Sequence, residues 1–347
     1  MAVSFLKKST AFVTTGLLSA TILVSCSGNS NTPIASNDVP EGEVCAPEIA
    51  EIDFGIISTE SQENLKTLWE PFLAVMATEM ERPVNGFYAT DYAGVIEAMG
   101  AGKIQIAWYG GKSYIEAAAR SQAEAFAQTV ADDGSKGYYS HLITNKANPI
   151  VSEIDLEAGN GDQFVIENAE SLTFAFNDPN STSGFLVPTY YVFAQNSQNA
   201  DSIFAELIFA GSHEATAQAV ANNQVDVATN NSESLTRLEQ SDPEAFEQVQ
   251  VIWTSPVIPS DPIAYRQDLP ECLKEQMQAF FYNISDEAVL GPLGWSGFDQ
   301  AGDVDWNTIR ELELGKQILQ VQSDETLSNE EKQTKVAELN EQLETLK

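Results

Sequence analysis

Residues 91–111 read DYAGVIEAMGAGKIQIAWYGG, and this segment decides the fold because its pattern occurs twice in the chain. Asp91 is suited to cap a helix, and the glycine-rich turn after that helix leads into an apolar strand expected over residues 103–108 and a polar loop. Residues 212–231, SHEATAQAVANNQVDVATNN, repeat the order of helix, turn, strand and loop 121 positions later. This offset aligns Tyr92 with His213, so the sequence predicts an internal duplication in which the two side chains occupy equivalent places.

The duplication extends to the segments that precede each copy. Residues 52–57 have the pattern of a buried strand followed by a polar loop and a long helix, and residues 172–176 are followed in the same way. Strands that alternate with helices favour parallel β-sheets covered by helices on both faces. Ligands of such sheets bind beyond the carboxyl ends of the strands. We therefore predict an α/β protein with two lobes that face each other across a ligand cleft, with a generic α/β enzyme as the alternative.

A run of hydroxyl side chains stands where the second copy could bind an anion. Residues 177–184, NDPNSTSG, follow an apolar strand and precede a helix expected over residues 184–194. The first turn of a helix has unpaired backbone N–H groups and the positive end of the helix dipole, which both favour an oxyanion. Ser181, Thr182 and Ser183 are therefore candidate binding residues for a tetrahedral oxyanion, with simple helix capping as the alternative.

Three further side chains could complete an anion site. Tyr92 and His213 lie in the first turns of the two equivalent helices, where a phenol O–H or an imidazole N–H can donate to an anion held by the opposite lobe. An exposed tyrosine and a capping histidine are the alternatives. Tyr138 follows a turn-rich stretch at the expected first crossing between the lobes, so it either lines the cleft or packs against the hinge.

Two acidic residues near the expected cleft give a second constraint. Glu233 lies in the loop after the strand of the second copy, and Asp261 lies in a Pro-Ser-Asp-Pro segment that follows another strand. Acidic loop residues are most often solvated, and in a cleft that holds an anion they would repel it. A zwitterionic ligand with a cationic far end satisfies both the hydroxyl residues and the acids.

Composition and motifs exclude several classes of protein. The chain has 51 acidic and 17 basic side chains and a formal net charge of −34, which leaves no basic face for nucleic acid. The segment Gly110-Gly111-Lys112-Ser113 resembles the end of a phosphate-binding loop, but that motif requires glycine where Ile106 stands. There is no Gly-x-Ser-x-Gly motif, and the chain has two histidines without a His or Cys cluster. We therefore expect no catalytic residues, no metal and no cofactor.

The N-terminus has the pattern of a secreted bacterial lipoprotein. Residues 1–25 contain two lysines and a short apolar run, and the sequence Leu-Val-Ser-Cys that ends at Cys26 resembles a lipobox. We expect lipidation of Cys26, a flexible tether over residues 26–48 and a location in the bacterial periplasm or cell envelope. An ordinary signal peptide or a short membrane helix is the alternative. Cys45 and Cys272 remain as a possible disulfide, or as two unrelated thiols.

Several segments together resemble the phosphonate-binding proteins of ABC transporters. They are residues 54–61, 91–94, 106–110, 178–185, 225–231 and 293–295, together with the acidic C-terminal helix expected over residues 325–347 and packed on the body. The resemblance implies a type II periplasmic-binding-protein fold, in which two crossing strands join the lobes. We assign residues 49–143 and 260–347 to the first lobe and residues 144–259 to the second.

The resemblance also implies roles for the candidate residues. The phosphonate oxygens would lie against Ser181, Thr182, Ser183 and His213, Tyr92 and Tyr138 would complete the pocket, and Glu233 and Asp261 would hold the ammonium of 2-aminoethylphosphonate. The implied protein is a monomeric receptor that delivers organophosphonate to an ABC permease and its ATPase. A receptor for phosphite, methylphosphonate or phosphate, a sensory co-receptor and a lipoprotein phosphoester hydrolase are the alternatives.

Overall fold

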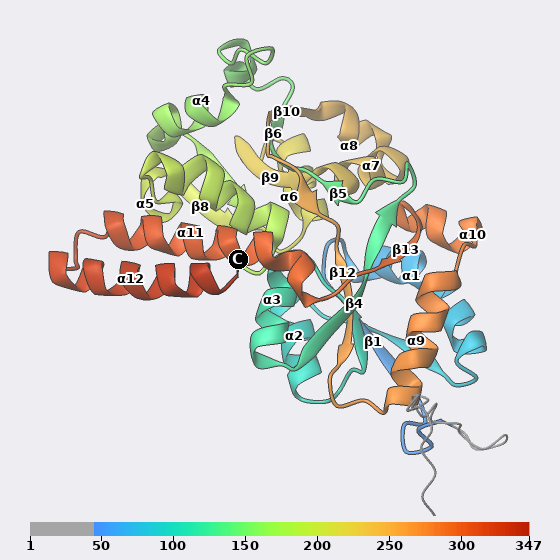
Figure 1. The fold of residues 1–347 in the computed structure, drawn as a ribbon. Coiled ribbons are helices and arrows are strands. Elements are labelled where there is room, and N and C mark those ends of the chain that lie inside the picture. Colours follow the sequence, from blue (N-terminus) through green and yellow to red (C-terminus); the bar gives the residue numbers. More distant parts are fainter. Residues whose placement is uncertain (1–44, 347) are drawn as a thin grey trace, which may run out of the picture. The chain divides into compact units, whose positions relative to one another are not determined.

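The computed structural model describes residues 45–346, which contain two central β-sheets (Figure 1). The predicted signal peptide, Cys26 and residues 27–44 of the predicted tether lie outside the described residues. The first sheet has six strands in the order β13-β4-β12-β3-β1-β2, and the second has five in the order β10-β6-β9-β7-β8. The strands of the first sheet are β1 (Ile52–Ile56), β2 (Val84–Tyr88), β3 (Ile106–Trp108), β4 (Ala123–Ala131), β12 (Pro262–Arg266) and β13 (Trp295–Gln300). Those of the second are β6 (Ser140–Asn145), β7 (Thr173–Phe176), β8 (Glu206–Phe209), β9 (Val227–Asn231) and β10 (Val249–Thr254).

Helices connect and cover these strands. Those that follow strands of the first sheet are α1 (Gln62–Glu79), α2 (Tyr92–Gly100), α3 (Gly111–Arg120), α9 (Glu271–Asn283) and α10 (Glu287–Leu290). The second sheet is accompanied by α4 (Gly161–Asn168), α5 (Ala200–Ile203), α6 (His213–Ala221), α7 (Ser232–Ser241) and α8 (Pro243–Gln248). Shorter 3-10 or π segments are η1 (Pro149–Ser152), η2 (Ala169–Ser171), η3 (Thr182–Leu186), η4 (Thr189–Phe193), η5 (Ala194–Asn196), η6 (Gly291–Leu293) and η7 (Asp303–Trp306). The chain ends with α11 (Asn307–Ser323) and α12 (Asn329–Thr345).

The two lobes have the same internal arrangement at the offset found in the sequence. Both bounds of α6 lie 121 positions after those of α2, and the same spacing relates α7 to α3. In each lobe three strands are parallel neighbours, with β1 between β2 and β3 and with β7 between β8 and β9. Antiparallel strands complete each sheet, β12 beside β3 and β6 beside β9. The duplication in the sequence is therefore a duplication of the fold.

Two short strands form the crossing between the lobes. β5 (Gly137–Tyr138) and β11 (Ile258–Pro259) pair antiparallel, and they lie between the strands of one sheet and those of the other along the chain. The second sheet begins at Ser140, because Ser140 already pairs with Asn231. The expected lobe boundary at residue 143 falls inside β6, so the structure places the passage between the lobes a few residues earlier.

Three elements differ in their bounds from the sequence prediction. β3 begins at Ile106 rather than at residue 103, because only residues 106–108 pair with β1. β9 continues through Asn230 and Asn231, which were expected in a loop, because both residues pair with β6. The helix expected from Gly184 begins at Thr182 and has π geometry, with the Leu186 N–H donating to the Ser181 carbonyl at 3.1 Å.

The core of the first lobe is a cluster of aromatic rings that supports the site. The ring centroids of Phe54 and Trp69 are 5.3 Å apart, and those of Trp69 and Trp108 are also 5.3 Å apart. Trp108 is the last residue of β3, so this packing fixes an indole that reaches the carboxyl end of the sheet. Phe174, Phe176 and Phe193 form the corresponding core of the second lobe.

The N-terminal end of the described chain is attached to the first lobe. A disulfide joins Cys45 to Cys272 in the first turn of α9, and Ala46 is buried in the core of the lobe. The Arg82 guanidinium donates to the carbonyls of Cys45 and Ile49 at 2.7 and 2.8 Å. Residues 45–48 therefore belong to the folded body, which shortens the expected tether because this cross-link and these hydrogen bonds hold its last residues.

The C-terminal hairpin corrects a second expectation. α12 was predicted to pack on the body, but it packs against α11, and none of its residues is buried. α11 itself contacts α3 of the first lobe and η4 and η5 of the second (Figure 1). Lys112 of α3 and Lys316 of α11 both pair with Glu313, at 3.3 and 2.8 Å.

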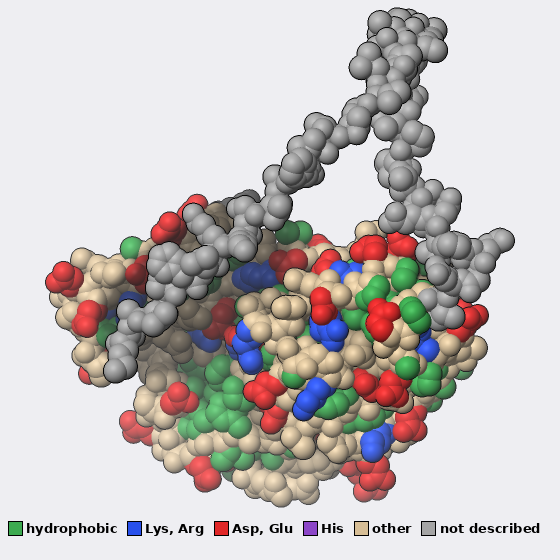
Figure 2. All heavy atoms as spheres, turned by 90° about the horizontal axis from the view of Figure 1, so that it is seen from below, with side chains coloured by type: hydrophobic (Ala, Val, Ile, Leu, Met, Phe, Trp, Pro, Cys, Tyr) green, Lys and Arg blue, Asp and Glu red, His purple; other side chains and the backbone are tan. Residues whose placement is uncertain are grey.

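The described surface agrees with the acidic composition. Figure 2 shows Asp and Glu side chains spread over the visible face, with Lys and Arg scattered among them rather than gathered in one basic patch. Within residues 45–346, no helix is long and apolar enough to cross a membrane.

Candidate ligand-binding site

A small, nearly filled cavity of about 10 Å³ lies where the two sheets direct the carboxyl ends of their parallel strands. All eight residues proposed from the sequence line it, namely Tyr92, Tyr138, Ser181, Thr182, Ser183, His213, Glu233 and Asp261. Six further residues complete the lining: Ile57, Thr59, Trp108, Gly110, Asn231 and Arg237. Residues from both lobes and from the hinge therefore meet around one cavity.

The hydroxyl run forms part of the wall of this cavity. Ser181 is the N-cap of the η3 helix, and its hydroxyl accepts from the Gly184 N–H at 3.0 Å. The N–H groups of Thr182 and Ser183 precede the first hydrogen bond of the helix, so helix geometry leaves them available to a ligand. The second sheet fixes this helix start, because the Ser140 hydroxyl donates to the Ser183 carbonyl at 2.6 Å.

Thr182 connects this part of the cavity wall to the first lobe. Its hydroxyl oxygen accepts from the backbone N–H of Lys112 at 2.9 Å, in the first turn of α3. Gly110, the N-cap of α3, has no side chain to do this, so a residue of the second lobe caps a helix of the first. The Thr182 hydroxyl also forms a hydrogen bond with the Tyr138 phenol.

Tyr92 and His213 occupy equivalent positions, as the repeat predicted. Each is the first residue of a helix. The preceding residue, Asp91 for α2 and Ser212 for α6, caps that helix with its side chain. The Tyr92 and His213 side chains are both buried. Burial raises the pKa of the Tyr92 phenol, so Tyr92 remains a protonated hydrogen-bond donor at neutral pH.

The hydrogen bonds around His213 fix its tautomer. Asn231 accepts the Ser234 N–H with its Oδ1 at 2.7 Å, so its Nδ2 is the atom 3.0 Å from His213 Nε2. Nε2 must therefore accept, and the proton lies on Nδ1, which has no partner among the described residues. Burial and the charge of Arg237 lower the pKa of His213 to about 3. At neutral pH the imidazole is a neutral donor and not a cation.

Two acidic residues also line the cavity, Glu233 and Asp261. Asp261 accepts from the Trp108 indole N–H with Oδ2 at 3.1 Å, while its buried Oδ1 has no partner among the described residues. Glu233, in the first turn of α7, makes no hydrogen bond or ion pair within the described chain. Burial and the charge of Glu233 raise the pKa of Asp261 well above its usual 3.8, and burial also raises the pKa of Glu233. Two carboxyl groups therefore meet in a desolvated site.

We expect Asp261→Asn to stabilise the ligand-free protein at neutral pH by about 1–2 kcal/mol, in the range of stabilising substitutions. The raised pKa of Asp261 means that folding favours its protonated form. In the wild type, the stability that comes from protonated Asp261 is fully present below about pH 4. It is lost as pH rises through the folded-state pKa of Asp261. Thermal unfolding of both proteins between pH 4 and 8 measures the effect, and identical pH slopes would contradict it.

Arg237 is the functional residue that sequence reasoning missed. Its Nε lies 2.8 Å from Glu60 Oε1 of the first lobe, and its Nη2 donates to the Ser234 hydroxyl at 2.9 Å. The available signal was the spacing of Glu233 and Arg237, four residues apart on one helix, which places them on the same face.

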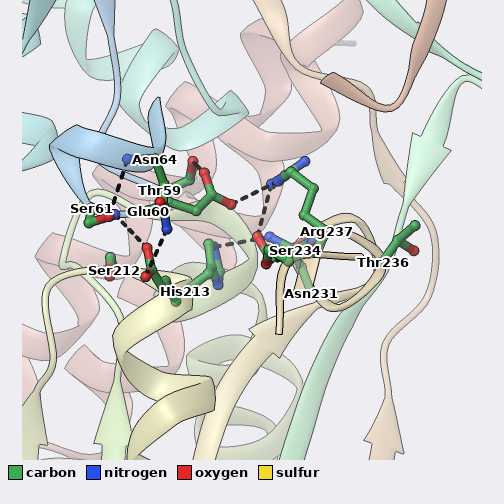
Figure 3. A network of polar contacts seen from close by, with 12 residues as sticks. Thr59, Glu60, Ser61, Asn64, Ser212, His213, Asn231, Ser234, Thr236 and Arg237 are labelled. Carbon is green, nitrogen blue, oxygen red and sulfur yellow. Dashed lines mark hydrogen bonds and ion pairs between the residues drawn. The ribbon is translucent and has the colours of Figure 1, made fainter. Parts of the chain in front are cut away.

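The two lobes are closed against each other around the cavity. The His213 and Glu214 N–H groups both donate to the Thr59 carbonyl, at 2.9 and 3.2 Å. Glu214 in turn accepts from the Ser61 N–H at 2.7 Å and from Asn64 Nδ2 at 3.0 Å (Figure 3). Backbone N–H groups at the helix starts of each lobe therefore donate to acceptors of the other lobe.

Comparison with known proteins places this site in a family. Residues 54–306 match the family described as ABC transporter, phosphonate, periplasmic substrate-binding protein. The chain belongs to this family. It is 48% identical over 299 residues, 85% of either chain, to the phosphonates-binding periplasmic protein of Escherichia coli (strain K12). It is 26% identical over 71% of its length, and 76% of the relative, to a phosphate-import protein of Mycolicibacterium smegmatis.

Solved structures of the phosphonate-binding family share the fold. A binding protein component of an ABC phosphonate transporter from Pseudomonas aeruginosa has a TM-score of 0.81 and 45% identity, over 85% of this chain and 96% of that one. A Prochlorococcus marinus protein solved with methylphosphonate has a TM-score of 0.68 at 20% identity, over 77% and 99%. The predicted fold class and family are confirmed. Because the family consists of substrate-binding components of transporters, the prediction that the chain is not an enzyme is confirmed as well.

Proposed function

We propose that this protein captures a small organophosphonate outside the cytoplasm and delivers it to the permease and ATPase of an ABC importer. We propose 2-aminoethylphosphonate, or a small alkylphosphonate, as the ligand. The observation that carries the proposal is that hydroxyl groups and two carboxyl groups line one cavity. A zwitterion with a phosphonate at one end and an ammonium at the other matches this combination.

Neutral donors can hold the phosphonate. The hydroxyls of Ser181, Thr182 and Ser183 and the imidazole of His213 are all buried. Such fixed dipoles act more strongly in a desolvated site than in water, because the local dielectric constant is lower. The first turns of the helices at Tyr92, Thr182 and His213 add the positive ends of their dipoles.

The acids give the cavity a preference for a cation. Burial raises the pKa values of Glu233 and Asp261, which disfavours their ionised forms in the absence of a positive partner. An ammonium group between them would stabilise the ionised forms and would donate hydrogen bonds to their carboxylate oxygens. Methylphosphonate, phosphite and phosphate lack this group and would leave the acids uncompensated.

Closure couples binding to a change in shape. The lining residues are buried for the most part, so a ligand enters when the lobes separate at the crossing formed by β5 and β11. A ligand that contacts Tyr92 in one lobe and Ser183 in the other stabilises the closed form. We propose that the receptor acts as a monomer.

Titration calorimetry on the purified protein tests this function. The ligands are 2-aminoethylphosphonate, methylphosphonate, phosphite and phosphate, and we expect aminoethylphosphonate to bind most tightly. A preference for phosphate or phosphite would replace the proposed ligand with one of the alternatives. If none of the four binds, the proposed function is wrong. Release of phosphate from a phosphomonoester would instead support the hydrolase alternative.

We also propose that Cys26 carries a lipid that anchors the receptor to the cell envelope, because the Leu-Val-Ser-Cys sequence follows a short apolar run. Expression in a bacterial host is expected to place the protein in the membrane fraction, and Cys26→Ser should move most of it to the soluble fraction. Ser30→Ala is the control and should remain with the membranes. An unchanged distribution of Cys26→Ser would contradict lipidation.

A further inference from the structure

An ion pair that spans the two lobes lies beside the acidic residues of the cavity. Glu60 follows β1 of the first lobe, and its Oε1 lies 2.8 Å from Arg237 Nε on α7 of the second (Figure 3). The Thr59 hydroxyl donates to the other oxygen of Glu60, and the Ser234 hydroxyl accepts from Arg237 Nη2 at 2.9 Å. The side chains of Glu60 and Arg237 are 10% and 13% exposed, so solvent screens the pair only weakly.

The pair forms part of the cavity wall. Arg237 lines the cavity, and both Arg237 and Glu60 line a neighbouring pocket on the outer side. Glu233 lies one helical turn before Arg237, and it also lines the cavity. The guanidinium is therefore paired with Glu60 of the opposite lobe, and its charge also acts on Glu233 of its own helix.

These two carboxyl groups compete for one positive charge. Of the described acids, Glu60 is the one within ion-pair distance of Arg237. Glu233 makes no ion pair, although the charge of Arg237 acts on it. If Glu60 did not hold Arg237, the guanidinium could turn to Glu233 and neutralise it, since arginine has a long and flexible side chain.

We infer that Glu60 determines the selectivity for a cationic ligand by holding Arg237 away from Glu233, so that Glu233 remains available to the ammonium group of the ligand. This inference rests on the proposed binding of aminoethylphosphonate. Because Glu60 and Arg237 belong to different lobes, the arrangement forms when the lobes close. Glu60 is thus a positioning residue that acts through Arg237 and does not itself line the cavity.

The test compares the affinities for two ligands that differ at the far end. For each variant, calorimetry measures the ratio of the association constants of 2-aminoethylphosphonate and methylphosphonate. We expect Glu60→Gln to lower this ratio by roughly tenfold or more, because close charge pairs couple by at least about 1.5 kcal/mol. The loss of a contact between the lobes weakens both ligands and cancels in the ratio.

A second substitution separates selectivity from closure. In Glu60→Gln/Arg237→Gln no guanidinium remains to neutralise Glu233, so we expect the ratio to return to within about threefold of the wild-type value. Glu63→Gln, an exposed acid on α1, is the matched control and should leave the ratio unchanged. Methylphosphonate binding by each variant reports that it is folded.

Two results would overturn the inference. An unchanged ratio in Glu60→Gln would mean that the ion pair only holds the lobes together. A double variant with the same low ratio as Glu60→Gln would show that Arg237 does not neutralise Glu233. Failure of the proposed function is a different result, because the wild-type protein would then bind neither ligand.

Discussion

Glu233→Gln is expected to weaken 2-aminoethylphosphonate on the order of 100-fold, while methylphosphonate loses little. Removing one partner of a buried charged hydrogen bond costs about 2–5 kcal/mol, and much of this cost is the charge left unpaired. The ammonium of the ligand would face an amide instead of the unpartnered carboxylate at the start of α7. Methylphosphonate has no ammonium, and calorimetry with both ligands measures the difference.

The matched control for Glu233 lies on the same helix. Glu239→Gln removes the same charge from α7 at an exposed position, so both affinities should remain at their wild-type values. Equal losses for the two ligands in Glu233→Gln would remove the ammonium role of this residue. Such a result would not change the role proposed for the hydroxyl residues.

Gly184→Ala should abolish measurable binding of every phosphorus ligand, a loss on the order of 100-fold or more. A Cβ at this position would lie 2.4 Å from the Cβ of Asn177 and 2.9 Å from the Ser181 hydroxyl. The Asn177 Cβ is attached to the backbone and cannot rotate away, so the helix start with Thr182 and Ser183 must shift. Overpacking of this kind typically costs about 1–3 kcal/mol of stability, while a displacement of the binding groups removes their hydrogen bonds.

Calorimetry measures the loss in Gly184→Ala, and thermal unfolding establishes that the variant is folded. Gly302→Ala is the control, because a Cβ there meets no atom within 4 Å and the φ angle of −138° suits any residue. Wild-type affinity in Gly184→Ala would mean that the phosphonate lies away from the start of the helix.

The repeat made the fold and most of the site predictable. Apolar periodicity and helix caps are local signals, so α2 and α6 were expected at their observed starts, Tyr92 and His213. The hydroxyl run was predictable for the same reason, since a strand and a helix start flank it. The acids Glu233 and Asp261 were selected by a chemical argument about charge, and both line the cavity.

The features that the sequence did not predict depend on distant parts of the chain. Arg237 is held in the cavity wall by its pair with Glu60, 177 positions earlier. No local pattern indicates this partner. β9 extends to Asn231 because the residues at the start of β6 pair with it. The sequence indicated Cys45 and Cys272 as a possible disulfide, but not that this bond, across 227 positions, holds the end of the tether on the body.

The offset of 121 residues also bears on the direction in which a ligand can lie. A duplicated frame by itself gives two equal walls and would hold a ligand in either of two orientations. Ser181 of the second lobe occupies the place that Glu60 holds in the first, and Asp261 occupies the place of Ser140. Because matched positions hold a hydroxyl in one case and a carboxyl in the other, the two walls are not equivalent. Under the proposed function, a ligand with two unlike ends would therefore bind in a single orientation.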